Sequence, residues 1–128
     1  MKIKKAIIKE EKVLKREWKN ILFNFLTIFL SLLIVILFFK KPLLTTLFLA
    51  AVAILGLLKW KSQLTLIIFL FFGIIFGIGE IIVSNYEVWT YGVKDLGSIP
   101  IWIFILWGNT ATFIYQTIIE IKKMGVKR

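Results

Sequence analysis

The residues best suited to chemistry in this sequence are three carboxylates: Glu80, Glu87 and Asp95. Carboxylates act as general acids or bases, and their oxygens also suit a hard cation. Several aromatic side chains lie near them in the sequence, among them Trp89, Tyr91, Trp102 and Trp107. The faces of aromatic rings stabilise positive charge, so this stretch is the candidate catalytic region. The spacing of the three acids matches no known metal or catalytic motif.

Glu80 is the only full charge within any of the long apolar runs of the sequence. An ionisable residue inside a membrane span is costly and therefore points to function. Glu80 is three residues from the end of its run, or about 5 Å at 1.5 Å per residue, so it also reaches the interface. An acid–base role and a structural hydrogen bond both remain open. We expect its partners to be Trp102, which lies at nearly the same depth, the first turn of the fourth run or the connecting loop.

Small residues precede Glu80 on the same helical face. Gly73 and Gly77 are four residues apart, and Glu80 and Ser84 continue that face. A face without bulky side chains lets a neighbouring helix approach closely. We therefore predict a helix contact through Gly73 and Gly77, and this face is our candidate contact for self-association.

A second polar pattern occurs near the end of the sequence. Asn109, Thr112, Gln116 and Glu120 recur at helical spacing on one face. In lipid, such amides and hydroxyls form hydrogen bonds between helices, which predicts a packing seam. For the same reason, we expect the face that Asn24, Thr27 and Ser31 share in the first apolar run to meet another helix. A polar path for a substrate or ion is the alternative interpretation.

Four long apolar runs must position these side chains. They cover residues 21–39, 42–58, 64–83 and 99–119, with lengths of 19, 17, 20 and 21 residues. A helix needs about 20 residues to cross the hydrocarbon core of a bilayer. Hydrophobic residues make up 59% of the sequence and the mean hydropathy is +0.90. The sequence predicts an all-α polytopic membrane protein with four transmembrane helices in a bundle.

Charged segments flank this predicted transmembrane domain of residues 20–122. Residues 1–19 carry a net charge of +5, and Ile3, Ile7, Leu14 and Trp18 recur there at helical spacing. This pattern is typical of a basic amphipathic helix that lies on anionic lipid headgroups; a partly disordered charged tail is the alternative. The length of the first run predicts a retained anchor rather than a signal peptide. Residues 123–128 form a second basic tail.

The cations are distributed unequally between the two sides of the predicted bundle. With the N-terminus inside, the cytoplasmic segments hold 14 lysines and arginines and the outer connectors hold 3. Positive residues accumulate on the cytoplasmic side of membrane proteins. We therefore expect a multi-pass protein of the cytoplasmic membrane with both termini in the cytoplasm.

Composition also excludes several classes of function. The sequence has no cysteine and no histidine, which excludes disulfides, thiolate metal sites and the commonest general base. The net charge of +10 is concentrated at the ends of the apolar runs rather than spread over a basic face, so we expect no nucleic-acid binding. We also expect no metal site and no cofactor.

Several short motifs in the last two fifths of the chain resemble a pattern in small uncharacterised prokaryotic four-helix integral membrane proteins. They are Gly79-Glu80, Trp89-Thr90-Tyr91, residues 97–102 (GSIPIW) and Leu106-Trp107-Gly108. The Trp-x-Tyr loop with its following proline-led helix is also similar to the membrane subunits of heterodimeric lycopene (carotenoid) cyclases. Those subunits have acidic residues just after the proline, where this chain has Ile101-Trp102-Ile103.

The sequence as a whole favours a small structural or interaction protein over an enzyme. Its recognition surface would be the loop of residues 84–98 with the adjoining helices, for lipid or for a partner in a homo-oligomer or larger membrane complex. The alternative is a membrane enzyme that acts on an isoprenoid or lipid, with Glu80 as acid or base and Glu87 or Asp95 assisting. A small transporter, or a subunit of one, is the third interpretation.

Overall fold

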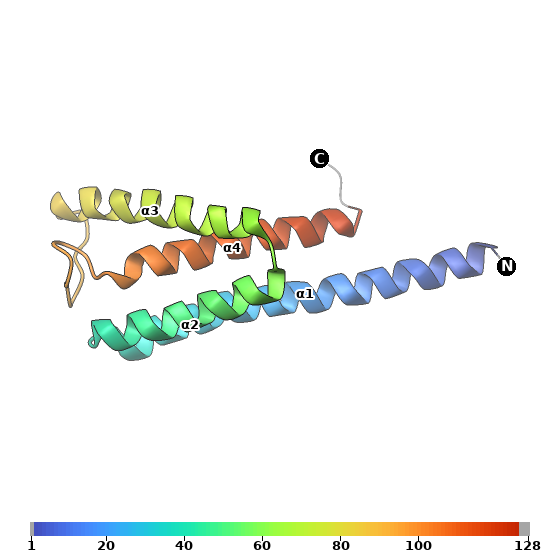
Figure 1. Cartoon of the computed structure of the whole chain (residues 1–128), viewed down its shortest axis with the longest axis horizontal. Coiled ribbons are helices and arrows are strands. Elements are labelled where there is room, and N and C mark those ends of the chain that lie inside the picture. Colours follow the sequence, from blue (N-terminus) through green and yellow to red (C-terminus); the bar gives the residue numbers. More distant parts are fainter. Residues whose placement is uncertain (1, 126–128) are drawn as a thin grey trace.

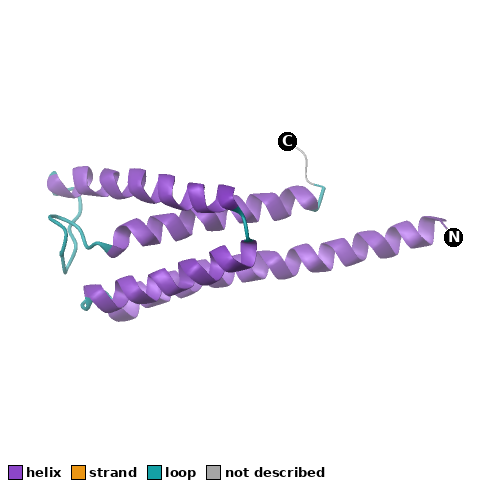
Figure 2. Ribbon diagram, viewed as in Figure 1, coloured by secondary structure: helices purple, strands orange, loops and turns teal. Residues whose placement is uncertain are grey.

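The computed structural model describes residues 2–125, apart from the side chain of Val13. Four helices make up nearly all of this part of the chain: α1 (Lys2–Phe38), α2 (Pro42–Trp60), α3 (Gln63–Asn85) and α4 (Trp102–Lys123). Figures 1 and 2 show them as one elongated bundle. The prediction of an all-α fold with four helices is confirmed.

Successive helices run in opposite directions, so the connections gather at two ends of the bundle. The turn between α1 and α2 and the loop of residues 86–101 lie at one end, which we call the loop end (Figure 1). Both chain termini and the connection between α2 and α3 lie toward the other end, which we call the terminal end (Figure 1).

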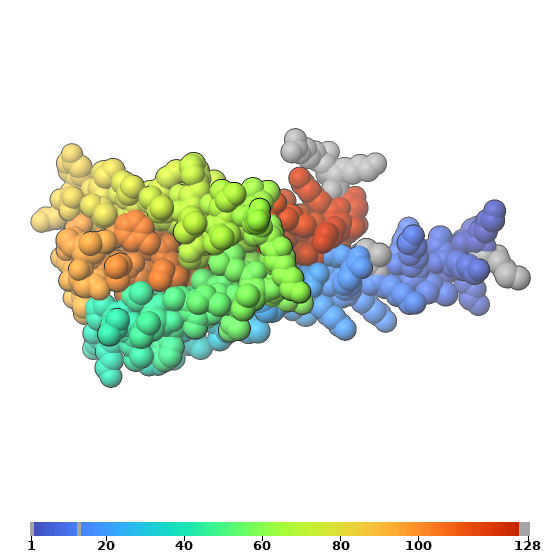
Figure 3. All heavy atoms as spheres, in the orientation of Figure 1, coloured from blue at the N-terminus to red at the C-terminus, as the bar shows by residue number. Residues whose placement is uncertain are grey.

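Helix α1 differs from the prediction of a separate helix before the first apolar run. Residues 2–38 form one continuous helix of 37 residues, and its N-terminal part projects beyond the rest of the molecule (Figure 3). No proline or glycine interrupts the chain near Lys19, so nothing breaks the backbone hydrogen bonds there. The charged segment is helical, but in this structure it extends the first apolar run instead of forming its own element.

The short connections are fixed by local backbone chemistry. Pro42 is in the first turn of α2, where its missing N–H costs no hydrogen bond. Lys61 ends α2 in a left-handed conformation, and its N–H donates to the carbonyl of Leu57. Ser62 then caps α3 by accepting a bond of 3.2 Å from the Thr65 N–H. Two residues are therefore enough to reverse the chain.

Three helices, α1, α2 and α3, are long and apolar enough to cross a membrane. Their apolar side chains point outward: Ile36, Leu43 and Leu55 are 68%, 73% and 64% exposed. Polar side chains occupy the interior instead, including Asn24, Ser31 and Asn109. An apolar outside around a polar inside is the arrangement expected of a protein surrounded by lipid.

An apolar cluster fills the interior near the loop end. Leu49, Ile99, Trp102 and Ile103 are its buried members. They come from α2, the end of the loop and the start of α4. The cluster therefore separates the polar interior from the loop.

Candidate functional site

Glu80 is the centre of a hydrogen-bonded cluster at the loop end of α3. Its Oε2 accepts hydrogen bonds from Trp89 Nε1 (2.9 Å) and from the Tyr91 hydroxyl (2.5 Å). Its Oε1 accepts a third from Trp107 Nε1 (3.1 Å). We call these four residues the Glu80 cluster. Both carboxylate oxygens therefore have partners from the same chain.

Three elements meet in this cluster. Glu80 lies in α3, Trp107 lies in the second turn of α4, and Trp89 and Tyr91 come from the loop between these helices. Hydrogen bonds to an ionised acceptor are stronger than bonds between neutral groups. One carboxylate thus fastens the loop to the two helices that flank it.

The rest of the loop is tied down independently. Asp95 Oδ1 accepts a hydrogen bond of 2.6 Å from the Ile101 N–H at the approach to α4. Leu96 and Ile99 bond each other through their backbones around a tight turn. Gly97 in this turn has a φ of 63°, a conformation that glycine adopts without strain. The hydroxyls of Ser84 and Ser98 also lie 2.6 Å apart.

The Glu80 cluster changes the acidity of Tyr91. The pKa of the Tyr91 hydroxyl is raised, chiefly by burial and further by the hydrogen bond to Glu80 and the negative charge of that carboxylate. Each of these effects disfavours a second negative charge at this position. Tyr91 is therefore a stable donor of a hydrogen bond.

This geometry suits a structural anchor better than an acid–base catalyst. Glu80 is only 9% exposed, and it lines none of the four cavities that we describe in residues 2–125. A general base needs hydrogen-bond reach to the proton that it removes. In the described structure, the aromatic donors occupy the positions from which a substrate would approach.

The other two candidate acids do not join Glu80. Glu87 is exposed, with a φ of 59°, and Asp95 is engaged with the backbone as described above. Among the described residues, no three acidic, histidine or cysteine side chains gather at a distance suited to a metal ion. These three carboxylates are close together in the sequence, but the structure does not gather them into one site.

Of the expected partners of Glu80, the connecting loop bonds it through Trp89 and Tyr91, whereas Trp102 does not. Trp102 is 5% exposed, and its Nε1 has no hydrogen-bond partner within the described part of the chain. Its ring meets that of Tyr91 edge to face, with centroids 6.3 Å apart. Trp102 instead belongs to the apolar cluster, because its ring points toward the bundle interior.

The close helix contact through Gly73 and Gly77 is present, but it lies within one chain. A Cβ atom built at Gly77 would be 2.2 Å from the Phe104 ring, and one at Gly73 would be 2.9 Å from the Phe104 carbonyl oxygen. Helix α4 therefore covers the face that we proposed for self-association. An oligomer of this fold must use another surface.

The polar stripe of α4 bonds across the interior, as a packing seam requires. Asn109 donates to Ser31 Oγ (3.1 Å) in α1 and to the Leu49 carbonyl (3.4 Å) in α2. Gln116 donates to Thr65 Oγ1 (2.5 Å) in α3. The stripe therefore connects α4 to all three other helices.

The matching stripe on α1 contains the predicted face of Asn24, Thr27 and Ser31, and it also includes Glu17, which was not predicted. Glu17, Asn24 and Ser31 are all at most 1% exposed, although Glu17 was assigned to a charged surface segment. These three residues recur every seven positions, a spacing that keeps them on one helical face. This regular spacing continues from the charged segment into the first apolar run, and it indicates that one helix contains both.

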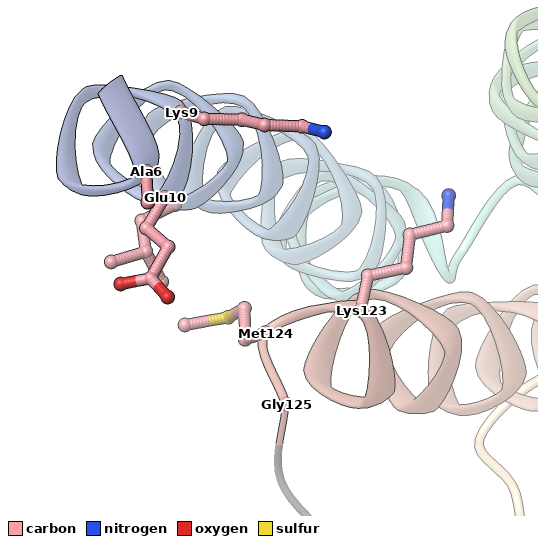
Figure 4. A pocket seen from close by; sticks show the side chains of 7 residues that line it. Ala6, Lys9, Glu10, Lys123, Met124 and Gly125 are labelled. Carbon is pink, nitrogen blue, oxygen red and sulfur yellow. The ribbon is translucent and has the colours of Figure 1, made fainter. Parts of the chain in front are cut away.

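A wide groove lies at the terminal end, between the start of α1 and the end of α4. Its volume is about 510 Å³, and Glu10 and Lys123 are among its lining residues. Figure 4 shows the side chains of Glu10 and Met124 extending toward each other from the two helices. The groove results from α1 continuing past the point at which α2 and α3 connect. The predicted tail of residues 123–128 lies in part outside the described residues, which end at 125.

No protein-family model, no curated protein and no solved structure matches this chain. The case for a function therefore depends on the arrangement of the residues themselves.

Proposed function

We propose that this chain is a four-span integral protein of the cytoplasmic membrane with a structural or interaction role. Helices α1 to α3 have the length and composition of spans. Helix α4 has 22 residues, and its buried polar residues Asn109, Thr112 and Gln116 face the other helices. Its lower hydropathy is therefore compatible with a fourth span, because the polar side chains are kept away from lipid.

The distribution of cations supports an orientation with both termini in the cytoplasm. Residues 1–19, 59–63 and 122–128, the segments that would be cytoplasmic, carry 14 of the 17 lysines and arginines in the sequence, in agreement with the positive-inside tendency. The loop end then faces outward. Lys15, Arg16 and Lys19 would lie nearest the inner surface of the bilayer, where they attract anionic headgroups.

The observation that carries the interaction role is the complete use of Glu80 by donors of its own chain. A carboxylate held in this way gives the outer loop a fixed shape. That loop exposes apolar side chains, with Tyr86 and Val88 at 81% and 67% exposure. A rigid surface with exposed aromatic and apolar groups is suited to a partner, because little conformational entropy is lost on binding.

Site-specific crosslinking in intact membranes tests this role. A photoreactive phenylalanine analogue replaces Val88 in the outer loop, and the same analogue at Ile78, which is exposed on α3, is the control. We expect one discrete protein adduct from position 88 and none from position 78. Adducts with lipid alone from both positions would contradict the proposed role.

A membrane enzyme for an apolar substrate is the second candidate, and one groove favours it. This groove of about 240 Å³ lies between α3 and α4 and is lined only by apolar and aromatic residues, including Phe76. The Phe76 ring contacts that of Trp107, with centroids 4.9 Å apart, and Trp107 bonds Glu80. If the chain is such an enzyme, the Glu80→Gln variant should still fold but should no longer turn over an isoprenoid or lipid.

A small transporter has less support. The polar interior meets the apolar cluster of Leu49, Ile99, Trp102 and Ile103 before it reaches the loop end. A path for a polar substrate would have to open this cluster. Reconstituted vesicles that release a trapped ion or amino acid would favour this third role.

A further inference from the structure

A polar cavity opens between α1, α2 and α4 at the terminal end of the bundle. Its volume is about 230 Å³. The residues that determine its chemistry are Asn24, Lys59, Trp60, Gln116, Glu120 and Lys123. This is the volume of about seven or eight water molecules at roughly 30 Å³ each, so the cavity has room for a small polar group.

Glu120 is the unusual residue in this cavity. It is 6% exposed, and its Oε2 has no hydrogen-bond partner among residues 2–125. Its Oε1 lies 3.6 Å from Lys123 Nζ. A buried carboxylate oxygen without a donor is costly, and Glu120 lines the cavity, so a hydrogen-bond donor from a ligand in the cavity would stabilise this carboxylate.

The neighbouring amides are already engaged and give the cavity a fixed wall. Asn24 accepts a hydrogen bond of 3.1 Å from Trp60 Nε1 and donates to Thr117 Oγ1 at 3.4 Å. Gln116 donates to Thr65. These side chains therefore cannot turn to satisfy Glu120 without breaking bonds between helices.

The charges that line the cavity favour a ligand that carries both a positive and a negative charge. Lys59 and Lys123 favour an anion such as a phosphate, whereas Glu120 would repel it. A simple cation would be drawn to Glu120 and repelled by the two lysines. A group that joins a phosphate to a primary amine satisfies both, since the ammonium donates to Glu120 and the phosphate oxygens accept from the lysines.

We propose that this cavity binds the phosphoethanolamine head group of a lipid in the inner leaflet. The depth of the cavity supports a lipid as the source, because Trp60 ends α2 there and tryptophans prefer the membrane interface. The inference depends on the proposed membrane placement but not on the interaction role of the outer loop. The two proposals therefore fail separately: a chain that stays monodisperse without detergent contradicts the membrane placement, whereas the tests below address only the cavity.

Binding of defined lipids to the purified chain in detergent, followed by native mass spectrometry, tests the proposal. Phosphatidylethanolamine, phosphatidylcholine and phosphatidylglycerol with identical acyl chains are compared. We expect phosphatidylethanolamine to bind about tenfold more tightly than either of the others, because only its head group combines a phosphate with an N–H donor. Equal binding of all three lipids would overturn the proposal and indicate a water-filled cavity.

Two pairs of variants locate the effect. Glu120→Gln should reduce the preference for phosphatidylethanolamine to less than twofold, whereas Glu87→Gln, on the outer loop, should leave it unchanged. Lys123→Gln should weaken the binding of phosphatidylethanolamine severalfold, and its exposed neighbour Lys122→Gln should not. A result in which each variant matches its control would overturn the assignment to this cavity.

Free phosphoethanolamine distinguishes a lipid from a soluble ligand. We expect it to displace phosphatidylethanolamine only when it is present in large excess. Displacement at concentrations comparable to that of the lipid would contradict the bilayer as the source of the ligand.

Discussion

At the scale of single residues, the unexpected feature is how an acid is accommodated among apolar side chains at the loop end of the bundle. Glu80 is satisfied by two indole N–H groups and one phenol rather than by a cation. Aromatic donors bring a hydrogen bond and an apolar body together, and this combination suits the membrane interface. Glu80 can therefore be buried without a paired positive charge.

Removing one donor should have a measurable cost. Tyr91→Phe deletes the hydroxyl that bonds Glu80, and we expect it to lower the free energy of unfolding by about 1–3 kcal/mol. Tyr86→Phe is the matched control, because Tyr86 is 81% exposed. Thermal unfolding in mild detergent measures both, and equal stabilities of the two variants would contradict the account.

The raised pKa of Tyr91 predicts a pH dependence at alkaline pH. Below pH 10, near the usual pKa of 10.0 for tyrosine, Tyr91 is protonated in both the folded and the unfolded chain, and its contribution to stability is fully present. As the pH rises above 10, the unfolded chain loses this proton more readily, so the contribution declines.

Tyrosinate absorbance during an alkaline titration checks this prediction. The wild-type chain should show a component that resists ionisation until the protein unfolds, and Tyr91→Phe should remove that component. A titration curve in which Tyr91→Phe removes a tyrosine that ionises near pH 10 would show that the pKa is not raised.

At the scale of elements, close contact between α3 and α4 positions the Glu80 cluster. Gly73 faces the backbone of α4 and Gly77 leaves room for the Phe104 ring, so the two helices lie close enough for Trp107 to reach the carboxylate of Glu80. The hydrogen bonds of the polar stripes on α1 and α4 then hold α3 and α4 against α1 and α2. Packing and hydrogen bonding thus act together along the whole bundle.

A larger side chain at Gly77 should separate α3 from α4. Gly77→Leu places new atoms in the volume of the Phe104 ring, and we expect a loss of about 1–3 kcal/mol in the free energy of unfolding. Gly79→Leu is the control, since a Cβ there has no neighbour within 4 Å. Both unfolding in detergent and oligomer size are measured. Unchanged stability together with altered oligomer size would show that this face is a contact between chains.

The sequence predicted the helices well, because each apolar run has the length of a span and ends at Lys, Pro or a polar loop. It also indicated Glu80 as a candidate site residue, because Glu80 is a charged residue among apolar ones. It did not identify Trp107 as a partner of Glu80, since the five-residue step from Trp102 to Trp107 changes both the depth and the direction of the side chain. The cavity around Glu120 was also missed, because its walls come from three helices that are distant in the sequence.

At the scale of the whole molecule, the chain is organised as an apolar shell around polar contacts, with different chemistry at each end. The loop end is rigid and holds a saturated carboxylate, whereas the terminal end is basic and holds an unsatisfied one. These two ends have separate roles only if a bilayer separates them. The central claim is therefore that all four helices, including the less apolar α4, cross the membrane.

Single-cysteine labelling in intact cells measures this most directly, because the chain has no cysteine of its own. Lys94→Cys lies in the exposed outer loop, and Lys122→Cys lies near the end of α4. With a maleimide that cannot cross membranes, we predict that position 94 is labelled in intact cells and position 122 only after permeabilisation. Labelling of position 122 in intact cells at the same rate as position 94 would contradict a fourth span.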